Sequence, residues 1–166
     1  MRCLAEVAER KGINYFLPNW TDVACDPGLR LELLKETGIF ESEHVVLVGS
    51  SFGGYVSALA AEEYEIDGLF LLVPILAKKR NEKCRLRPRS KEFVIIQASE
   101  DEYTDPRDVV DFANASGADL HLLSGGHSLE KHLALIDHVF EAFLDKIAGD
   151  AQQIGGINSE SLRSSP

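Results

Sequence analysis

The sequence has few of the basic residues and none of the long apolar runs that are typical of nucleic-acid-binding and membrane proteins. Its 17 Lys and Arg residues are outnumbered by 27 Asp and Glu residues, which gives a formal net charge of -10. A general nucleic-acid binder needs a positive surface to release counterions from phosphate, so we expect small-molecule partners instead. No apolar run approaches the roughly 20 residues of a membrane span, and acidic residues stand where a signal peptide would have its apolar core. We therefore expect a cytoplasmic protein.

Cysteine is also scarce. Cys3, Cys25 and Cys84 are odd in number, far apart and outside any CxxC or Cys/His spacing. They are expected to be free thiols, and no metal site is predicted. The chain has 166 residues, of which 45% are hydrophobic, and this suits one domain with a core of its own.

Strand-like and helix-like patterns alternate along the chain. Continuous apolar runs predict strands, and helical spacing predicts the segments between them; the predicted strands are 13–18, 44–49, 68–76, 92–98 and 118–123, and the predicted helices are 1–11, a segment from about residue 27, 51–64, 105–116 and 128–148. This order predicts a three-layer α/β/α sandwich with a mainly parallel sheet of about five strands. Residues 149–166 lack periodicity, so we expect a domain at 1–148 and a flexible C-terminal tail at 149–166.

The stretch VVLVGSSFGGYVSALAA, residues 45–61, contains the pattern G-x-S-x-G at Gly49, Ser51 and Gly53. Ser51 stands where a buried strand must turn sharply into a helix, and such a turn projects the hydroxyl above the sheet. We expect side chains at either glycine position to collide with the neighbouring strand and helix, so that both positions suit glycine. Ser51, rather than its neighbour Ser50, is the candidate nucleophile.

A second interpretation of the same stretch is a Gly/Ser turn in a Rossmann-like domain that binds phosphate at a helix N-terminus. That interpretation is disfavoured because the chain has no G-x-G-x-x-G, and no acidic residue closes the following strand as a ribose ligand would.

A serine nucleophile needs a base and an orienting carboxylate. The acidic loop after the strand at 92–98 offers Asp101, with Glu100, Glu102 and Asp105 as alternatives; Asp105 can instead cap the helix that Pro106 opens. After the last strand, the glycines of SGGH let the chain return over the sheet with His127 as the candidate base. The order Ser, Asp, His is that of a known type of triad. Simpler roles are expected for the other histidines, His44, His121, His132 and His138.

The motifs GSSFGGYVSALA, ASEDEYTDP and GGHSL resemble those of small single-domain α/β-hydrolases, especially compact bacterial esterases and related serine hydrolases without a lid domain. The resemblance covers residues 1 to about 147. It implies hydrolysis of carboxylic esters or thioesters without a cofactor, through an acyl-enzyme on Ser51 with Asp101 and His127. It also implies that the N–H of Phe52 contributes to an oxyanion hole. The alternatives are a catalytically inactive interaction protein on the same fold, and a transferase or lyase that uses the same residues.

Members of this family normally begin with a further strand and a His-Gly loop, which have no counterpart here. That strand would lie between the strands at 13–18 and 44–49, so we expect these two to pair directly rather than leave backbone groups unpaired. Because the missing loop supplies an oxyanion donor, we also expect weak ester hydrolysis from this 166-residue form, as a shortened version of a longer protein.

Basic residues are concentrated in AKKRNEKCRLRPRSK, residues 77–91, which holds Lys78, Lys79, Arg80, Lys83, Arg85, Arg87, Arg89 and Lys91. One interpretation is a solvated loop. The other is that the loop 78–91 overhangs the site and favours anionic esters through charge steering and Arg contacts. The sequence does not decide oligomeric state.

Overall fold

The computed structural model describes residues 2–76 and 85–161, with residues 2 and 151–161 described by their backbone only. The regular elements alternate in the predicted manner and are α1 (Arg2–Arg10), α2 (Pro27–Glu36), β1 (Val46–Ser50), α3 (Phe52–Glu63), β2 (Ile66–Leu72), β3 (Ser90–Ala98), α4 (Pro106–Ser116), β4 (Asp119–Leu123) and α5 (Leu133–Ser161), with short 3-10 turns at Ile39–Glu41 and Glu130–His132.

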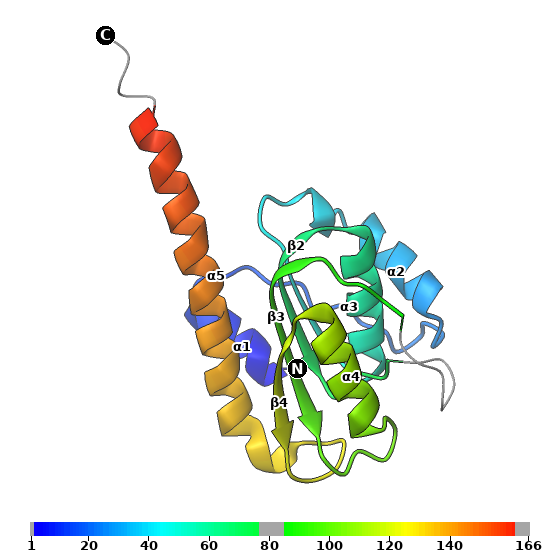
Figure 1. Cartoon of the computed structure of the whole chain (residues 1–166). Coiled ribbons are helices and arrows are strands. Elements are labelled where there is room, and N and C mark those ends of the chain that lie inside the picture. Colours follow the sequence, from blue (N-terminus) through cyan, green and yellow to red (C-terminus); the bar gives the residue numbers. More distant parts are fainter. Residues whose placement is uncertain (1, 77–84, 162–166) are drawn as a thin grey trace.

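The four strands form one parallel sheet in the order β1-β2-β3-β4. Helices α2, α3 and α4 cover one face and α1 and α5 cover the other (Figure 1). The predicted three-layer α/β/α architecture is therefore confirmed. Because all strands run the same way, their carboxyl ends lie along a single edge of the sheet.

The core is divided into two by the sheet. Successive side chains of a strand point to opposite faces, so neighbouring residues of β2 contribute to different clusters. The α2–α3–α4 side buries Leu47, Leu69, Leu71, Phe93 and Ile95 from the strands. The α1–α5 side buries Phe70, Leu72, Val94 and Ile96, with the rings of Phe140 and Phe143 from α5 against Phe70. Every residue of β2 is buried, as the continuous apolar run predicts.

The prediction of a strand at residues 13–18 is wrong. Residues 13–20 have no regular secondary structure, and Tyr15, Phe16 and Leu17 are about half exposed. They do not pair with β1, whose ladder partner in the sheet is β2, so the expected direct pairing is wrong as well. Helix α1 packs against α5 on the far face of the sheet, and the chain then crosses to α2 without joining the sheet.

Two other boundaries differ from the prediction. Strand β2 ends at Leu72 rather than at residue 76, because Val73 adopts a φ of 40° and Pro74 follows it. Helix α5 continues to Ser161, so residues 149–161 are helical where the sequence analysis expects a tail without periodicity. In the described part of the chain, no helix is both long enough and apolar enough to cross a membrane.

Candidate active site

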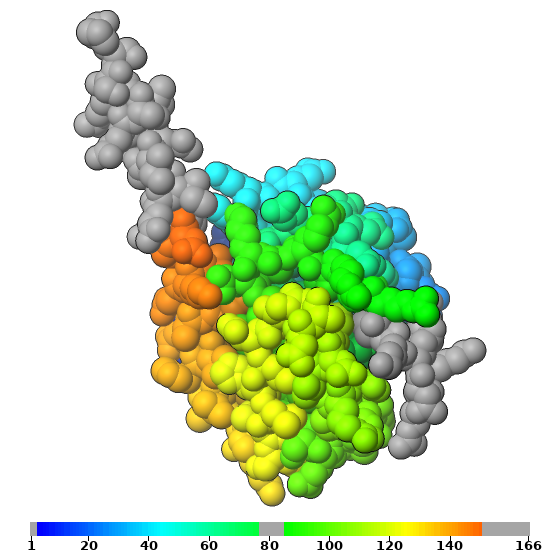
Figure 2. Space-filling view, viewed as in Figure 1, coloured from blue at the N-terminus to red at the C-terminus, as the bar shows by residue number. Residues whose placement is uncertain are grey.

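The candidate site lies at the carboxyl edge of the sheet, where parallel α/β sheets bind their ligands. Ser51 follows β1, the acidic loop follows β3, and the Gly-rich loop with His127 follows β4. The loops after β3 and β4 lie together at the lower end of the molecule in the space-filling view (Figure 2). They are joined by two backbone hydrogen bonds, from Ser99 N–H to the Leu123 carbonyl (2.7 Å) and from Glu100 N–H to the Gly125 carbonyl (3.0 Å).

Ser51 occupies a strained turn between β1 and α3. Its φ of 54° and ψ of -123° lie outside the usual regions for a residue with a side chain. The surrounding backbone maintains this conformation, because the Ser51 N–H donates to the Leu72 carbonyl (2.9 Å) and the Ser51 carbonyl accepts from Ile75 N–H (3.1 Å) and Gly54 N–H (3.0 Å). The turn is the one that the G-x-S-x-G spacing predicts.

The glycines around Ser51 differ in why they are needed. A Cβ at Gly49 would lie 2.5 Å from the Gly53 carbonyl oxygen and 2.6 Å from Ser57 Oγ, as expected. A Cβ at Gly53 would meet nothing within 4 Å, so the predicted collision at that position is wrong. The next residue carries the constraint instead, because a Cβ at Gly54 would lie 2.9 Å from Pro74 Cβ.

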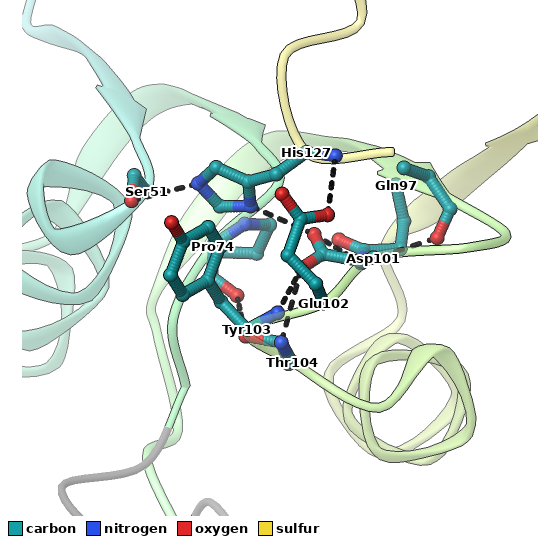
Figure 3. Close-up of polar contacts among 9 residues, drawn as sticks. Ser51, Pro74, Gln97, Asp101, Glu102, Tyr103, Thr104 and His127 are labelled. Carbon is teal, nitrogen blue, oxygen red and sulfur yellow. Dashed lines mark hydrogen bonds and ion pairs between the residues drawn. The ribbon is translucent and has the colours of Figure 1, made fainter. Parts of the chain in front are cut away.

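The structure brings Ser51, His127 and Asp101 into one chain of hydrogen bonds (Figure 3). His127 Nε2 lies 2.9 Å from Ser51 Oγ, and His127 Nδ1 lies 2.9 Å from Asp101 Oδ2. An ionised carboxylate only accepts hydrogen bonds, so Nδ1 carries the proton and Nε2 presents its lone pair to the serine hydroxyl. This is the arrangement in which imidazole can take a proton from serine.

Asp101 is enclosed by donors. Its side chain has no exposed surface, and Oδ1 accepts the N–H groups of Tyr103 (2.8 Å) and Thr104 (3.0 Å). Burial acts to raise the pKa of Asp101, but the His127 ring and the two N–H groups outweigh it and hold the pKa below its ordinary value. Asp101 is therefore ionised at neutral pH although it is buried.

The other acidic residues of the loop have different partners. Glu102 Oε2 accepts a hydrogen bond from the backbone N–H of His127 (3.1 Å), so Glu102 contacts the backbone of the His127 loop rather than the imidazole ring. Asp105 caps α4 by accepting the Arg107 N–H (2.9 Å), as the capping interpretation predicts. Glu100 contacts the His127 loop through its backbone N–H. Asp101 is thus the carboxylate that reaches the imidazole.

Gln97 is a residue of this site that the sequence analysis did not single out. It is fully buried in β3, and its Nε2 donates to Asp101 Oδ2 at 3.0 Å. Its Oε1 is a buried atom without a hydrogen-bond partner. The available signal was a single amide in the otherwise apolar run FVIIQA, four residues before the aspartate. Gln97 therefore shares Oδ2 with His127.

Arg30 of α2 is a second residue that the sequence analysis missed. It is buried, and its guanidinium lies 5.3 Å from the ring of Trp20 and 5.0 Å from the ring of Phe52. It also donates to the carbonyls of Val23 (3.2 Å) and Ala24 (3.2 Å). Arg30 thus connects the segment before α2 to the residue that follows Ser51.

Phe52, the predicted oxyanion residue, is the first residue of α3. The N–H groups of a helix's first turn have no acceptor within the helix, and they carry its partial positive charge. The Ser51 side chain makes no capping bond to these groups. The Phe52 N–H is therefore suited to receive negative charge next to Ser51.

The described half of the basic stretch lies away from this site. Arg87 N–H donates to Glu62 Oε1 (2.9 Å), and the Arg89 guanidinium donates to the Glu63 carbonyl (2.7 Å). Both glutamates stand at the end of α3, which is at the amino ends of the strands. The expectation that the loop overhangs the site is wrong for Arg87, Arg89 and Lys91, and residues 77–84 lie outside the described residues.

Within residues 3–76 and 85–150, whose side chains the structure describes, no group of three or more His, Cys, Asp and Glu side chains is placed to hold a metal ion. Cys3 and Cys25 are free thiols.

No protein-family model and no curated protein matches the chain. Among solved structures, it is similar to a lid-less α/β serine hydrolase from Xanthomonas campestris (21% identity, 87% of this chain and 72% of that one, TM-score 0.63). A similar likeness is found to an α/β serine hydrolase homologue from Coxiella burnetii (20% identity, 85% and 74% coverage, TM-score 0.63). At these identities the likeness shows the fold.

A third structure shows more than the fold. It is a protein from Xanthomonas campestris pv. campestris assigned to the hydrolases of the α/β superfamily, with a TM-score of 0.75. It is 32% identical to this chain, over 87% of this chain and 88% of its own. The chain described here belongs to the α/β-hydrolase superfamily.

Proposed function

We propose that the protein hydrolyses carboxylic esters or thioesters through an acyl-enzyme on Ser51. The observation that carries the proposal is the hydrogen-bonded chain from Asp101 through His127 to the Ser51 hydroxyl, with 2.9 Å at each step. It is supported by the strained turn that presents Ser51 and by a relative assigned to the hydrolases of this superfamily.

In the first step, Ser51 Oγ forms a bond to the carbonyl carbon while its proton passes to His127 Nε2. The bond from that carbon to the alcohol or thiol then breaks, and Nε2 gives the proton to the leaving atom. In the second step, His127 takes a proton from water as the water oxygen attacks the acyl carbon. The bond from that carbon to Ser51 Oγ then breaks and Nε2 returns the proton to Oγ, which releases the free acid and restores the serine.

Asp101 and Phe52 have supporting roles in this scheme. Asp101 remains ionised, keeps the proton of neutral His127 on Nδ1 and stabilises the imidazolium that forms. The Phe52 N–H donates to the oxygen that becomes negative in the tetrahedral intermediate. This donor is a backbone group that is already in place at the start of α3.

The test compares Ser51→Ala with the matched variant Ser50→Ala, since the two serines are adjacent. Ser51→Ala is expected to lower ester turnover by several orders of magnitude and to abolish labelling by a fluorophosphonate, which phosphonylates activated serines. Ser50→Ala is expected to retain both. The measurements are turnover of short-chain esters and thioesters and the mass shift of the labelled peptide.

Equal labelling of the Ser51→Ala variant and the wild type would contradict the assignment of the nucleophile. A wild type that is neither labelled nor active would support the alternative that the protein is a catalytically inactive interaction protein with this fold. Labelling with release of a product other than the free acid would indicate a transferase or a lyase.

A further inference from the structure

An aromatic side chain stands directly beside the candidate base. The Tyr103 ring packs edge-on against the His127 ring, with 4.7 Å between ring centroids and 68° between ring planes. Figure 3 shows it next to the imidazole, with its hydroxyl on the side of Ser51. Tyr103 is nevertheless 65% exposed. Most of its surface is free to contact a bound molecule.

The position of Tyr103 is well defined by its own loop. Its N–H donates to Asp101 Oδ1 at 2.8 Å. The next residue, Thr104, is buried and donates through its N–H to the same oxygen and through Oγ1 to the Pro74 carbonyl (3.2 Å). The backbone of this loop is thus held by the Asp101 carboxylate and, through Thr104, by the Pro74 carbonyl that follows β2. These bonds hold the backbone that carries the ring, and the ring itself lies against His127.

The chemistry of ester cleavage requires the leaving group to lie beside the His127 imidazole, where the Tyr103 ring is. The proton that His127 Nε2 takes from Ser51 must pass to the leaving oxygen, which requires that oxygen within hydrogen-bond distance of Nε2. The alcohol part of the ester therefore extends past the His127 ring. Tyr103 is the residue whose ring contacts that imidazole.

We propose that Tyr103 forms the leaving-group subsite, and that the enzyme favours esters of alcohols with an aromatic ring over esters of short alkyl alcohols. This inference rests on the proposed ester hydrolysis. A contact between two aromatic rings favours binding by about 2- to 12-fold beyond the area that it buries.

The charges around Tyr103 favour a neutral leaving group. Glu100 and Glu102 belong to the same loop, and the Glu102 carboxylate lies against the His127 backbone. Arg87, Arg89 and Lys91, which could attract an anion, bond to Glu62, Glu63 and Asp67 at the opposite end of the sheet. Among the described residues, an anionic leaving group would thus meet the like charges of Glu100 and Glu102, whereas Arg107 at the start of α4 is paired with Asp105.

The experiment measures the ratio of kcat/KM for benzyl acetate to that for methyl acetate. The two esters share the acyl group, and their alcohols have similar acidity, so the ratio reports contacts to the alcohol part. Any effect of a substitution on His127 itself changes both values and cancels in the ratio. The variants are Tyr103→Ala, Tyr103→Phe and, as a matched control, Tyr15→Ala, because Tyr15 is a second exposed tyrosine and stands in the segment that follows α1.

We expect the ratio to fall by about 2- to 12-fold in Tyr103→Ala and to be unchanged in Tyr103→Phe and Tyr15→Ala. An unchanged ratio in Tyr103→Ala overturns the proposal, and so does an equal fall in Tyr15→Ala. An equal fall in Tyr103→Phe also overturns it, because the hydroxyl rather than the ring would then be responsible. If the wild type hydrolyses neither ester and takes up no fluorophosphonate, the proposed function fails together with this inference.

Discussion

Single residues around Ser51 show how a sequence motif and a spatial constraint can differ. The pattern G-x-S-x-G has glycine on both sides of the serine, but only Gly49 is required by its surroundings. A Cβ at Gly53 would meet no described atom within 4 Å, and the close approach falls one residue later, at Gly54 against Pro74. Pro74 has little freedom to move, because it follows Val73, which has a positive φ, and it precedes Ile75, which is hydrogen-bonded to Ser51.

Gly53→Ala and Gly54→Ala therefore form a matched pair within one turn of α3. Alanine at 53 meets no atom within 4 Å and removes a glycine from a helix, so the free energy of unfolding should stay equal or rise by up to about 1 kcal/mol. Alanine at 54 would lie 2.9 Å from Pro74 Cβ, and such overpacking lowers stability by about 1–3 kcal/mol. Urea unfolding of both variants measures the difference. Equal stabilities would show that Pro74 moves away freely.

The residues of the candidate site differ in how well the sequence could predict them. Ser51, Asp101 and His127 follow strand ends in a known order, so their positions could be predicted from spacing and chemistry together. Gln97 could not, because it lies inside an apolar strand where a polar residue has no characteristic spacing. Tyr103 is adjacent to the predicted acid, but only the loop conformation places its ring against the imidazole.

At the scale of elements, the segment 13–18 shows that a strand needs a partner as well as a suitable composition. INYFLP has the aromatic and β-branched residues that strands favour. Such propensity has little effect unless the segment lies alongside a strand, and residues 13–20 do not pair with the outer edge of β1. The runs at 44–49, 68–76, 92–98 and 118–123 differ because each has a neighbour in the parallel sheet. Sequence patterns therefore predicted the strands that pair and overestimated the one that does not.

Helix α2 is connected to the site through Arg30. The guanidinium lies over the rings of Trp20 and Phe52 and donates to two carbonyls of the preceding segment. Arg30→Met keeps most of the side-chain volume but leaves those carbonyls without their donor. We expect the free energy of unfolding to fall by about 1–3 kcal/mol.

Arg30→Lys should recover little of this loss, because an ammonium lacks the planar surface that stacks on both rings. Thermal and urea unfolding of the two variants provide the measurement. If the free energy of unfolding of Arg30→Met lies within about 0.5 kcal/mol of the wild-type value, the contacts of Arg30 do not stabilise the segment before α2.

At the scale of the whole molecule, two buried or nearly buried carboxylates stand at opposite ends of the sheet. Asp101 follows the carboxyl end of β3, and Asp67 lies at the amino end of β2, where it accepts from Val45 N–H (3.0 Å) and Lys91 Nζ (2.6 Å). Burial acts to raise the pKa of Asp67, but the Lys91 ammonium, the Val45 N–H and the His44 ring outweigh it and hold the pKa below its ordinary value. Both pKa values are thus shifted downward on folding.

A pKa that falls on folding makes the ionised carboxylate a source of stability. This contribution is complete above the unfolded-state pKa, which is about 4 for aspartate, and is lost as the pH falls through the lower folded-state pKa. Asp67→Asn and Asp101→Asn should each lower the free energy of unfolding at pH 7 by about 1–3 kcal/mol. Their difference from the wild type should shrink as the pH is lowered below about 4, because the wild-type side chains then become neutral.

The double variant tests whether the two ends of the sheet act independently. About seven residues of β3 separate the levels of Asp67 and Asp101, which corresponds to roughly 20 Å along the strand, and the two carboxylates share no hydrogen-bond partner. Substitutions at such a distance add to within about 0.5 kcal/mol. The loss in Asp67→Asn/Asp101→Asn at pH 7 should therefore equal the sum of the two single losses, as measured by urea unfolding. A double loss that differs from the sum by more than about 1 kcal/mol would show that the sheet couples its two ends, since independent sites do not deviate that far.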